Sequence, residues 1–255
     1  MLPAPFRRFA VGAGRFLREL LYPQTCCLCG KWANDPEGVP LCPACRGDLV
    51  PFRGPRCCVC GVPLPGSLPA LGGTCRRCRA GETPCDWIRT LGLYRRPWKD
   101  LVRAYKFGRR KPLGLFFAEG LGVLLERELS VLDGVVLVPI PLHPRRVRQH
   151  GFDPPLELAG YLGKRLHLRV ERALIRLRPT PPQTGMNLEQ RRRNLNGAFG
   201  LRSPVSPRLE LEKVLLVDDV ITTGTTISTA AHVLRDGGSR WVGAVAVAGT
   251  PRIFD

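Results

Sequence analysis

Residues 214–226 read Val-Leu-Leu-Val-Asp-Asp-Val-Ile-Thr-Thr-Gly-Thr-Thr, so an apolar run leads into two carboxylates and then a hydroxyl-rich turn. We expect a buried strand that ends before Asp218 and Asp219, and a helix over about residues 227–235 that stops at Gly237. Backbone N–H groups at a helix N-terminus bind phosphate, because they lack intrahelical partners and lie at the positive end of the helix dipole. This order of elements predicts a sugar-phosphate site.

Each residue type in this segment suits one part of such a ligand. Asp218 and Asp219 are acceptors for ribose hydroxyls or for a hydrated Mg²⁺. Gly224 lets the backbone approach an anion closely. The hydroxyl donors around it are Thr222, Thr223, Thr225 and Thr226. A plain strand, turn and Thr-capped helix is the alternative, and the coincidence of these features in order favours the binding site.

The segment resembles the phosphoribosyl pyrophosphate signature of type I phosphoribosyltransferases. The resemblance implies that Asp218 and Asp219 form the catalytic pair at the ribose, and that the Thr/Gly loop cradles the 5′-phosphate. In that family a loop after an early strand holds pyrophosphate, and residues 139–152 look similar. Guanidinium groups suit this work, since they bind phosphate bidentately and stay charged. The candidate pyrophosphate contacts are Lys106, Arg145, Arg146, Arg148 and Arg191.

All 11 cysteines lie between Cys26 and Cys85, and eight of them form Cys-x-x-Cys pairs. The pairs make two quartets with the spacing of tetrahedral zinc sites. These quartets are Cys26, Cys29, Cys42 and Cys45, and Cys57, Cys60, Cys75 and Cys78. Four thiolates leave no position for water, so we expect two structural Zn²⁺ ions. A disulfide framework and a crossed pairing of the quartets are alternatives, although no secretory signal precedes the cysteines.

The formal net charge is +18, and two stretches hold most of the excess. Residues 95–111 carry eight Lys and Arg against one acid, and residues 143–193 carry twelve against four. Such clustering predicts an anion-binding surface, either for single-stranded DNA or for a phosphate-rich substrate. Trp98, Tyr105 and Phe107 are interleaved with the first stretch. They are compatible with stacking on unpaired bases or with a helix core.

The chain divides into three predicted parts: residues 1–25, 26–85 and 86–255. The first is a basic amphipathic helix that either packs onto the zinc module or lies on an anionic membrane. The second is a double zinc-ribbon module. The third is an α/β domain, a mostly parallel sheet flanked by helices. We expect its strands at 88–94, 135–138, 173–177, 214–217 and 241–248, and its helices at 97–107, 113–129, 154–166 and 227–235. Residues 183–194, within a long polar stretch, are a mobile lid, a solvated loop or a helix over 188–193 with a charged face.

Several short motifs occur in one order along the chain. They are the cysteine pairs, Tyr105-Lys-Phe, Val138-Pro-Ile-Pro-Leu-His, Gly151-Phe, Gln183-Thr-Gly and the acidic Thr/Gly segment. Together they resemble the ComF (competence protein F) family over about residues 17–248. The resemblance implies a zinc-binding module joined to a phosphoribosyltransferase-type domain. It also implies a role in natural transformation with incoming single-stranded DNA and DNA-uptake machinery proteins as partners, in the cytoplasm or at the inner face of the membrane.

One motif departs from the family. After the pyrophosphate loop the family usually reads Arg-Gly-Phe-Asn-Gln, whereas this chain reads His-Gly-Phe-Asp-Pro from His150. Asp153 is more repulsive toward a polyphosphate than an asparagine, so the sequence favours ligand binding over fast turnover. Three hypotheses follow. The first is a phosphoribosyltransferase that uses phosphoribosyl pyrophosphate with Mg²⁺, and the second is a nucleic-acid-handling protein of the DNA-uptake pathway, with phosphoribosyl pyrophosphate or a nucleotide as its ligand. The third is a zinc-stabilised adaptor with a vestigial site.

Overall fold

The computed structural model describes residues 24–33, 35, 38–49, 54–64, 73–83, 85–108, 110–128, 134–177, 197–202 and 213–250. The chain splits into two compact units, Met1–Asp48 and Leu49–Asp255. The predicted N-terminal helix, the candidate lid and Arg191 lie outside the described residues. The boundaries after residues 25 and 85 stay predictions. Within the described residues, no helix is long and apolar enough to cross a membrane.

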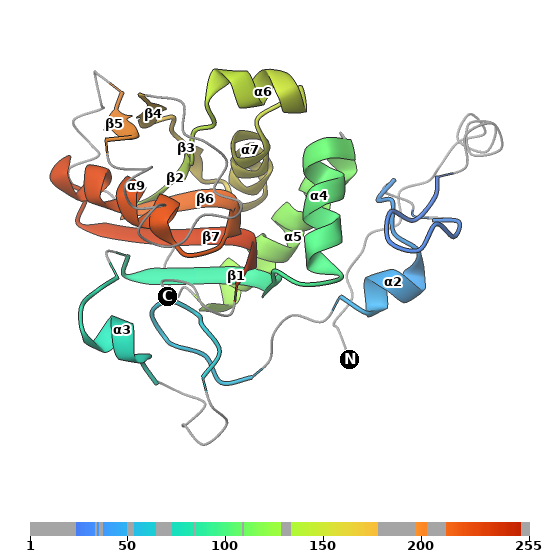
Figure 1. The fold of residues 1–255 in the computed structure, drawn as a ribbon, viewed down its shortest axis with the longest axis horizontal. Helices are drawn as coiled ribbons and strands as arrows, with labels where there is room; N and C mark the ends of the chain where they lie inside the picture. Colours follow the sequence, from blue (N-terminus) through green and yellow to red (C-terminus); the bar gives the residue numbers. More distant parts are fainter. Residues whose placement is uncertain are drawn as a thin grey trace. The chain divides into compact units, whose positions relative to one another are not determined.

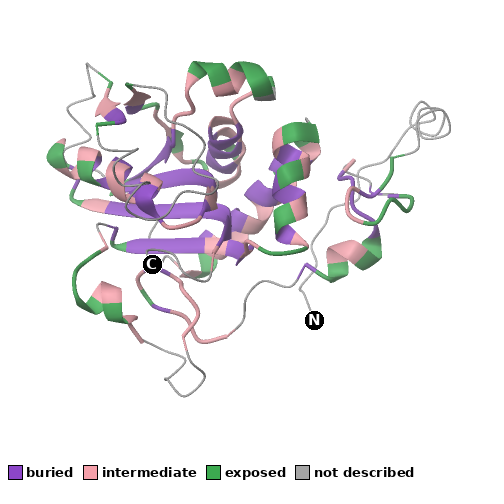
Figure 2. Cartoon of the chain, viewed as in Figure 1, coloured by how far each residue is buried: buried purple, intermediate pink, exposed green. Residues whose placement is uncertain are grey.

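A five-stranded sheet forms the centre of the second unit, and all its strands are parallel (Figure 1). The strand order is β1-β7-β6-β2-β3. The strands are β1 Trp87–Leu93, β2 Val135–Pro139, β3 Arg169–Val170, β6 Lys213–Ile221 and β7 Trp241–Gly249. The middle strands are rich in Val, Leu and Ala and are buried on both faces, as Figure 2 shows, which is typical of parallel sheets. The predicted α/β fold class is confirmed.

Helices cover both faces of this sheet. The helices that lead from β1 to β2 and from β2 to β3 are α4 Trp98–Gly108, α5 Lys111–Glu128, α6 Pro144–His150 and α7 Pro154–Leu166. Helix α9, Thr225–Asp236, connects β6 to β7 in the opposite direction along the sheet. Because such crossovers are right-handed, α9 covers the face opposite to α5 and α7. Asp153 caps α7 as predicted, since its Oδ1 accepts a hydrogen bond from the Leu156 N–H at 3.3 Å.

Three elements differ from the sequence-based expectations. Strand β6 continues through the acidic pair to Ile221, because β7 runs alongside it to Gly249 and keeps it paired. The predicted strand at 173–177 is β4, Leu174–Arg176, and it pairs with β5, Phe199–Leu201, in a separate antiparallel sheet. Part of the predicted pyrophosphate loop is the helix α6, whose charged sequence has no apolar periodicity to reveal it.

Candidate functional site

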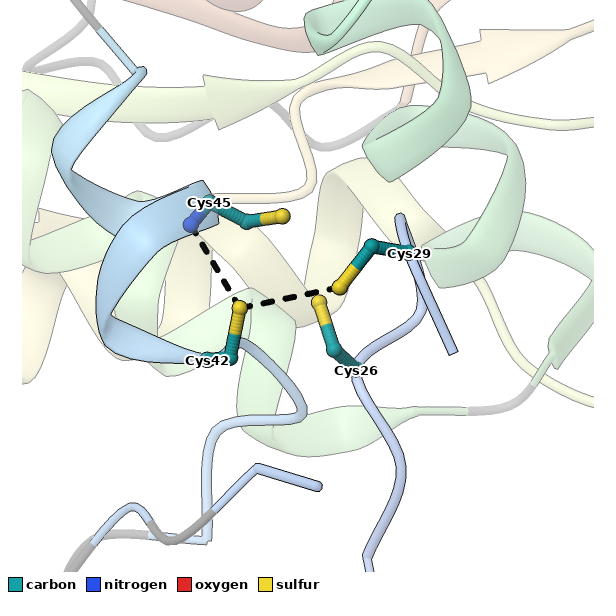
Figure 3. A group of neighbouring side chains, drawn as sticks. All are labelled: Cys26, Cys29, Cys42 and Cys45. Carbon is teal, nitrogen blue, oxygen red and sulfur yellow. Dashed lines mark hydrogen bonds between the residues drawn. The ribbon is translucent and has the colours of Figure 1, made fainter. Parts of the chain in front are cut away.

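The first cysteine quartet lies in the first unit and has the geometry of a zinc site. The sulfur atoms of its four residues all lie within 4.8 Å of one another. Their side chains point toward a common centre, with Cys45 on the short helix α2, Pro43–Gly47 (Figure 3). The Sγ atoms of Cys29 and Cys42 are 3.7 Å apart. Zn–S bonds of about 2.3 Å in a tetrahedron place sulfur atoms about 3.8 Å apart, so the quartet fits Zn²⁺.

The second quartet has the same geometry in the second unit. The sulfur atoms of Cys57, Cys60, Cys75 and Cys78 also lie within 4.8 Å of one another. The Sγ atoms of Cys60 and Cys75 are 3.7 Å apart, and the Cys75 N–H donates to Cys57 Sγ at 3.3 Å. Each quartet is therefore made of consecutive pairs, and the crossed pairing is not observed. Gly30 and Gly61 follow the first pair of each quartet with φ of +74° and +68°, as their tight turns require.

The three remaining cysteines are not zinc ligands. All eleven cysteines are described, and none of them forms a disulfide. The structure therefore does not contain the alternative disulfide framework. Cys85 is buried, and burial raises the pKa of its thiol to about 12. It is therefore a protonated core residue, packed with the cysteines of the second quartet.

The second zinc ribbon is part of the core of its unit. Cys57 and Cys60 belong to one hydrophobic cluster with residues of β6, β7 and α9. The Ile88 N–H at the start of β1 donates to the Val59 carbonyl at 2.7 Å. A Cβ on Gly61 would lie 2.8 Å from the Ile88 carbonyl oxygen, so only glycine permits this approach. The ribbon thus packs against the edge strand β1, whose other side pairs with β7.

The buried Arg89 side chain on β1 strengthens this packing. Its guanidinium donates to the carbonyls of Cys58 at 3.0 Å and Val59 at 3.2 Å, and it forms an ion pair with Glu128 at the end of α5. It also lies over the Trp87 ring at 5.0 Å. One buried cation therefore joins the ribbon, the sheet and a helix of the same unit.

The acidic pair lies near the carboxyl end of β6, where open parallel sheets bind ligands. Asp218 and Asp219 are 9% and 5% exposed. Side chains alternate along a strand, so the two carboxylates point toward opposite faces of the sheet edge. Burial and the neighbouring carboxylate raise the pKa of Asp218 to about 8, against the lowering effect of Lys106. The pair therefore holds a proton readily in the ligand-free protein.

Lys106 on α4 binds this pair directly. Its Nζ lies 2.7 Å from Asp219 Oδ1, and its side chain is one-quarter exposed. Burial favours a lower pKa for Lys106, but the carboxylates of Asp219 and Asp218 outweigh it, so the pKa is raised and the ammonium stays charged. The sequence suggested Lys106 as a pyrophosphate contact. In the ligand-free structure its partner is a carboxylate, so the pyrophosphate contact remains a prediction.

The turn after β6 is shaped by hydrogen bonds within the threonine-rich segment. Gly224 is the N-cap of α9 with φ of +73°, which an L side chain rarely adopts. The Thr223 and Thr225 hydroxyls are 2.9 Å apart. The Thr250 hydroxyl, at the end of β7, donates to the Thr222 carbonyl at 2.7 Å. Helix α9 begins at Thr225, earlier than predicted, which brings Thr225 and Thr226 into its first turn.

A cluster of arginines lies around the β2–α6 connection. Arg145, Arg146 and Arg148 are on α6. Burial lowers the pKa of His143, the N-cap of α6, and the positive charges of these arginines lower it further. Arg176 on β4 contributes to the same shift, and it also lowers the pKa of Asp218. Its Nη1 donates to the Pro141 carbonyl at 3.4 Å. Its Cζ lies 5.2 Å from the centre of the Phe199 ring.

The charge of Arg176 thus acts on both His143 and Asp218, and no sequence motif singled this residue out. Strand β4 has three residues, and Arg176 belongs to no recognisable motif. The only signal was its membership of the second basic stretch. Its place beside the site follows from the pairing of β4 with β5, which the sequence did not predict.

The structure also assigns the aromatic residues of the first basic stretch. Trp98 and Tyr105 are buried on α4, so the core interpretation holds for both and they are not available for stacking. The Tyr105 hydroxyl donates to the Pro154 carbonyl at 3.1 Å, and its ring packs edge-on against Phe152 at 5.3 Å. Phe107 is 68% exposed. Helix α4 is therefore packed against the beginning of α7 and against the loop before it.

Comparisons with known proteins agree with both halves of this description. Residues 17–79 match the double zinc ribbon domain, and residues 164–252 match the phosphoribosyl transferase domain. The chain is 33% identical to the DNA utilization protein YhgH of Escherichia coli over 193 residues, which are 73% of this chain and 80% of that protein. It is 27% identical to competence protein F of Haemophilus influenzae over 199 residues, 76% of this chain and 84% of that protein. It is 30% identical to competence protein ComFC of Streptococcus pneumoniae over 158 residues, 60% of this chain and 63% of that protein.

The matched domains coincide with the two Cys₄ sites and with the elements around the acidic pair. Both domains occur in the order that the motifs predicted. The similarity to YhgH extends over most of each chain. The chain therefore belongs to the ComF family of competence protein F and YhgH, with a double zinc ribbon followed by a phosphoribosyltransferase domain.

Proposed function

We propose that this protein binds phosphoribosyl pyrophosphate or a nucleotide at the carboxyl end of β6, and that it acts in DNA uptake during natural transformation. The proposed ligand binding rests on one short segment of the chain. A buried acidic pair is followed within a few residues by a left-handed Gly224 and the first turn of α9. A phosphorylated pentose offers hydroxyls to the carboxylates and a phosphate to the N–H groups of the turn.

The residues present also fit a divalent cation carried by the ligand. Asp218 and Asp219 are hard oxygen donors of the kind that Mg²⁺ prefers, and one or two carboxylates with substrate phosphates are its usual protein environment. When bound, Mg²⁺ would neutralise the charge of the pyrophosphate group. Lys106 would hold Asp219 in place from α4, and the arginines of α6 would add positive charge on the side of β2.

The cellular half of the proposal is supported by the relatives. Two of them are named competence proteins and one a DNA utilization protein. The net charge of +18 is compatible with a partner that carries phosphates. On this proposal the protein acts in the cytoplasm, and the DNA-uptake machinery supplies the incoming single-stranded DNA.

Transfer of the phosphoribosyl group is the second candidate activity. A nucleophile would attack C1 of the ribose as pyrophosphate leaves, and fixed cations would stabilise the negative charge on the leaving group. Asp153 argues against fast turnover. Burial raises the pKa of this carboxyl, and it lies close enough to Asp219 to add to the negative charge there. Binding is therefore the primary proposal.

Titration calorimetry tests the ligand half. Zinc-loaded protein is titrated with phosphoribosyl pyrophosphate and with ribose 5-phosphate, each with and without Mg²⁺. We expect binding that is lost in the double variant Asp218→Asn/Asp219→Asn. Asp236→Asn is the matched control, because this exposed carboxylate ends α9 away from its first turn. Absence of heat with every ribose 5-phosphate compound would reject the proposal.

A separate assay tests turnover. The protein is incubated with phosphoribosyl pyrophosphate, Mg²⁺ and a panel of nucleobases and amines, and pyrophosphate release is measured. Release above that of the double variant would establish the second candidate. Binding without release would leave ligand binding as the activity of the site.

A further inference from the structure

The two cysteine quartets differ in how well their sulfur ligands are shielded from solvent. In the first quartet Cys29 is exposed and Cys45 is partly exposed. All four ligands of the second quartet are described and none of them is exposed, and Cys57 and Cys60 are only 0% and 1% exposed. A reagent in solution therefore reaches a ligand of the first quartet more readily than any ligand of the second.

The quartets also differ in the core that surrounds them. Cys57 and Cys60 share one hydrophobic cluster with buried residues of β6, β7 and α9. The first unit has a much smaller core among its described residues. Apart from the cysteines, its buried apolar side chains there are Ala33, Val39, Pro40 and Leu41. A core of this size depends on its metal, so we expect loss of Zn²⁺ from the first quartet to unfold the chain around it.

Cys29 has the neighbours that conversion to a disulfide requires. Coordination to a metal keeps a thiol deprotonated, and the thiolate is the form that reacts with peroxide. The Cys29 Sγ lies 3.7 Å from the Cys42 Sγ, and all four sulfur atoms of the quartet lie within 4.8 Å of one another (Figure 3). An oxidised Cys29 therefore has a second thiolate beside it that can complete the reaction.

We propose that Cys29 is an oxidation site, at which hydrogen peroxide converts the first quartet to a disulfide while the second quartet keeps its four thiolates. In the first step the Cys29 thiolate attacks one peroxide oxygen, the O–O bond breaks, hydroxide leaves and the sulfur becomes a sulfenic acid. In the second step a neighbouring thiolate, such as that of Cys42, attacks this sulfur and displaces a second hydroxide. Two thiolates thus lose two electrons in total, and the peroxide is reduced to two hydroxide ions. The quartet is left with two thiolates, too few to hold Zn²⁺.

The effect of this oxidation is confined to the first unit. The acidic pair and the second quartet belong to the other unit, and the reaction uses none of their residues. The inference is therefore independent of the proposed phosphoribosyl ligand. A thiol reductant reverses a disulfide by exchange, so the first ribbon is a reversible redox switch in a chain whose phosphoribosyltransferase domain stays folded.

Zinc release, measured with a chromogenic chelator, tests the proposal on the full-length protein loaded with two Zn²⁺ ions. After addition of hydrogen peroxide, one ion should be released at least about tenfold faster than the other. Peptide mass spectrometry after this fast phase should find a disulfide that includes Cys29, with the four thiols of the second quartet still reduced. Dithiothreitol with added Zn²⁺ should then restore the original zinc content.

Two variants separate oxidation at Cys29 from general thiol oxidation. Cys29→His keeps a zinc ligand at this position, because Cys₃His is a common structural set, and it should slow the fast phase about tenfold or more. Cys58→Ser is the matched control, since Cys58 is exposed but belongs to neither quartet. It should leave the fast phase unchanged.

Four results would overturn the proposal. They are release of both ions at one rate, earlier oxidation of the second quartet, a disulfide that lacks Cys29, and oxidation of Cys58 while both ions stay bound. The release rates and the disulfide map of the wild-type protein decide between these outcomes even if Cys29→His binds only one ion.

Discussion

Replacing Arg89 with methionine tests whether the second zinc ribbon is held to the sheet by the buried guanidinium. The side chain is 8% exposed and its partner Glu128 is 21% exposed. Arg89→Met preserves the aliphatic volume but leaves the Cys58 carbonyl without its guanidinium donor. It also removes one of two donors from the Val59 carbonyl and one of two cations from the Glu128 carboxylate. The substitution therefore isolates the polar contacts from the packing.

The expected loss of unfolding free energy is about 3 kcal/mol. Removal of one partner from a buried ion pair costs about 3–5 kcal/mol. We expect a cost at the low end of this range, because Glu128 is partly solvated and retains its ion pair with Arg56 at 3.1 Å. A domain of this kind has a total stability of about 5–15 kcal/mol, so the change is a large fraction of it.

Urea denaturation of the zinc-loaded protein, followed by tryptophan fluorescence, measures this loss. Trp87, Trp98 and Trp241 belong to the same unit as the ribbon, so their signal reports on it. Arg127→Met, at an exposed position of α5, is the control and should change the stability by less than about 0.5 kcal/mol. Arg89→Met/Glu128→Leu should recover part of the loss, because an apolar replacement removes both buried charges. A loss below about 1 kcal/mol for Arg89→Met would show that the polar contacts of Arg89 do not hold the ribbon to the sheet.

The acidic pair and the zinc sites give further tests. Burial raises the pKa of Asp218 to about 8. Ligand binding that needs its carboxylate should therefore strengthen by up to about tenfold per pH unit from pH 6 to 8 and then level off. Asp218→Asn should abolish this pH dependence of the affinity in calorimetry. The raised pKa also means that stability falls as pH rises from about 4 to 8, so Asp218→Asn should raise the melting temperature at pH 9 more than at pH 5. Arg176→Met should weaken phosphoribosyl pyrophosphate more than ribose 5-phosphate, as measured by their separate dissociation constants. Cys60→Ser should unfold the second unit, whereas Cys29→Ser should leave its tryptophan transition unchanged, as seen by thermal melts.

The sequence predicted those parts of the molecule whose chemistry is local in the chain. The two quartets, the strand β6 and the helix α9 each lie within a short segment, so the local pattern was enough to find them, although β6 ends later and α9 begins earlier than predicted. Helix α7 was predicted with its boundaries, because Asp153 and the following prolines are strong start signals. The structure places Lys106 beside Asp219, and the ligand contacts of all the predicted site residues stay predictions.

The remaining features depend on contacts between distant segments. Arg176 reaches the site only because β4 pairs with β5 instead of joining the main sheet. Lys106 and Asp219 are far apart in sequence and meet through the packing of α4 beside β7. The placement of the second ribbon in the core depends on Gly61 and Arg89. The position of Gly61 after a cysteine pair predicted its tight turn but not its contact with β1, and no pattern distinguishes Arg89 from a surface residue.

Lys106 has two roles that must be compatible. In the ligand-free protein its ammonium neutralises Asp219 at 2.7 Å, while the proposed function also gives it a phosphate contact. A lysine ammonium has three donors on one compact charge, so it can hold a carboxylate with one N–H and a phosphate with another. A guanidinium paired bidentately with the carboxylate would instead commit two of its five N–H donors to one partner and fix the direction of the other three through its planar shape. The Lys106 side chain is one-quarter exposed, so we expect an incoming anion to reach its ammonium while the ion pair stays formed. We therefore expect the ion pair to prepare the site for a phosphorylated ligand instead of competing with it.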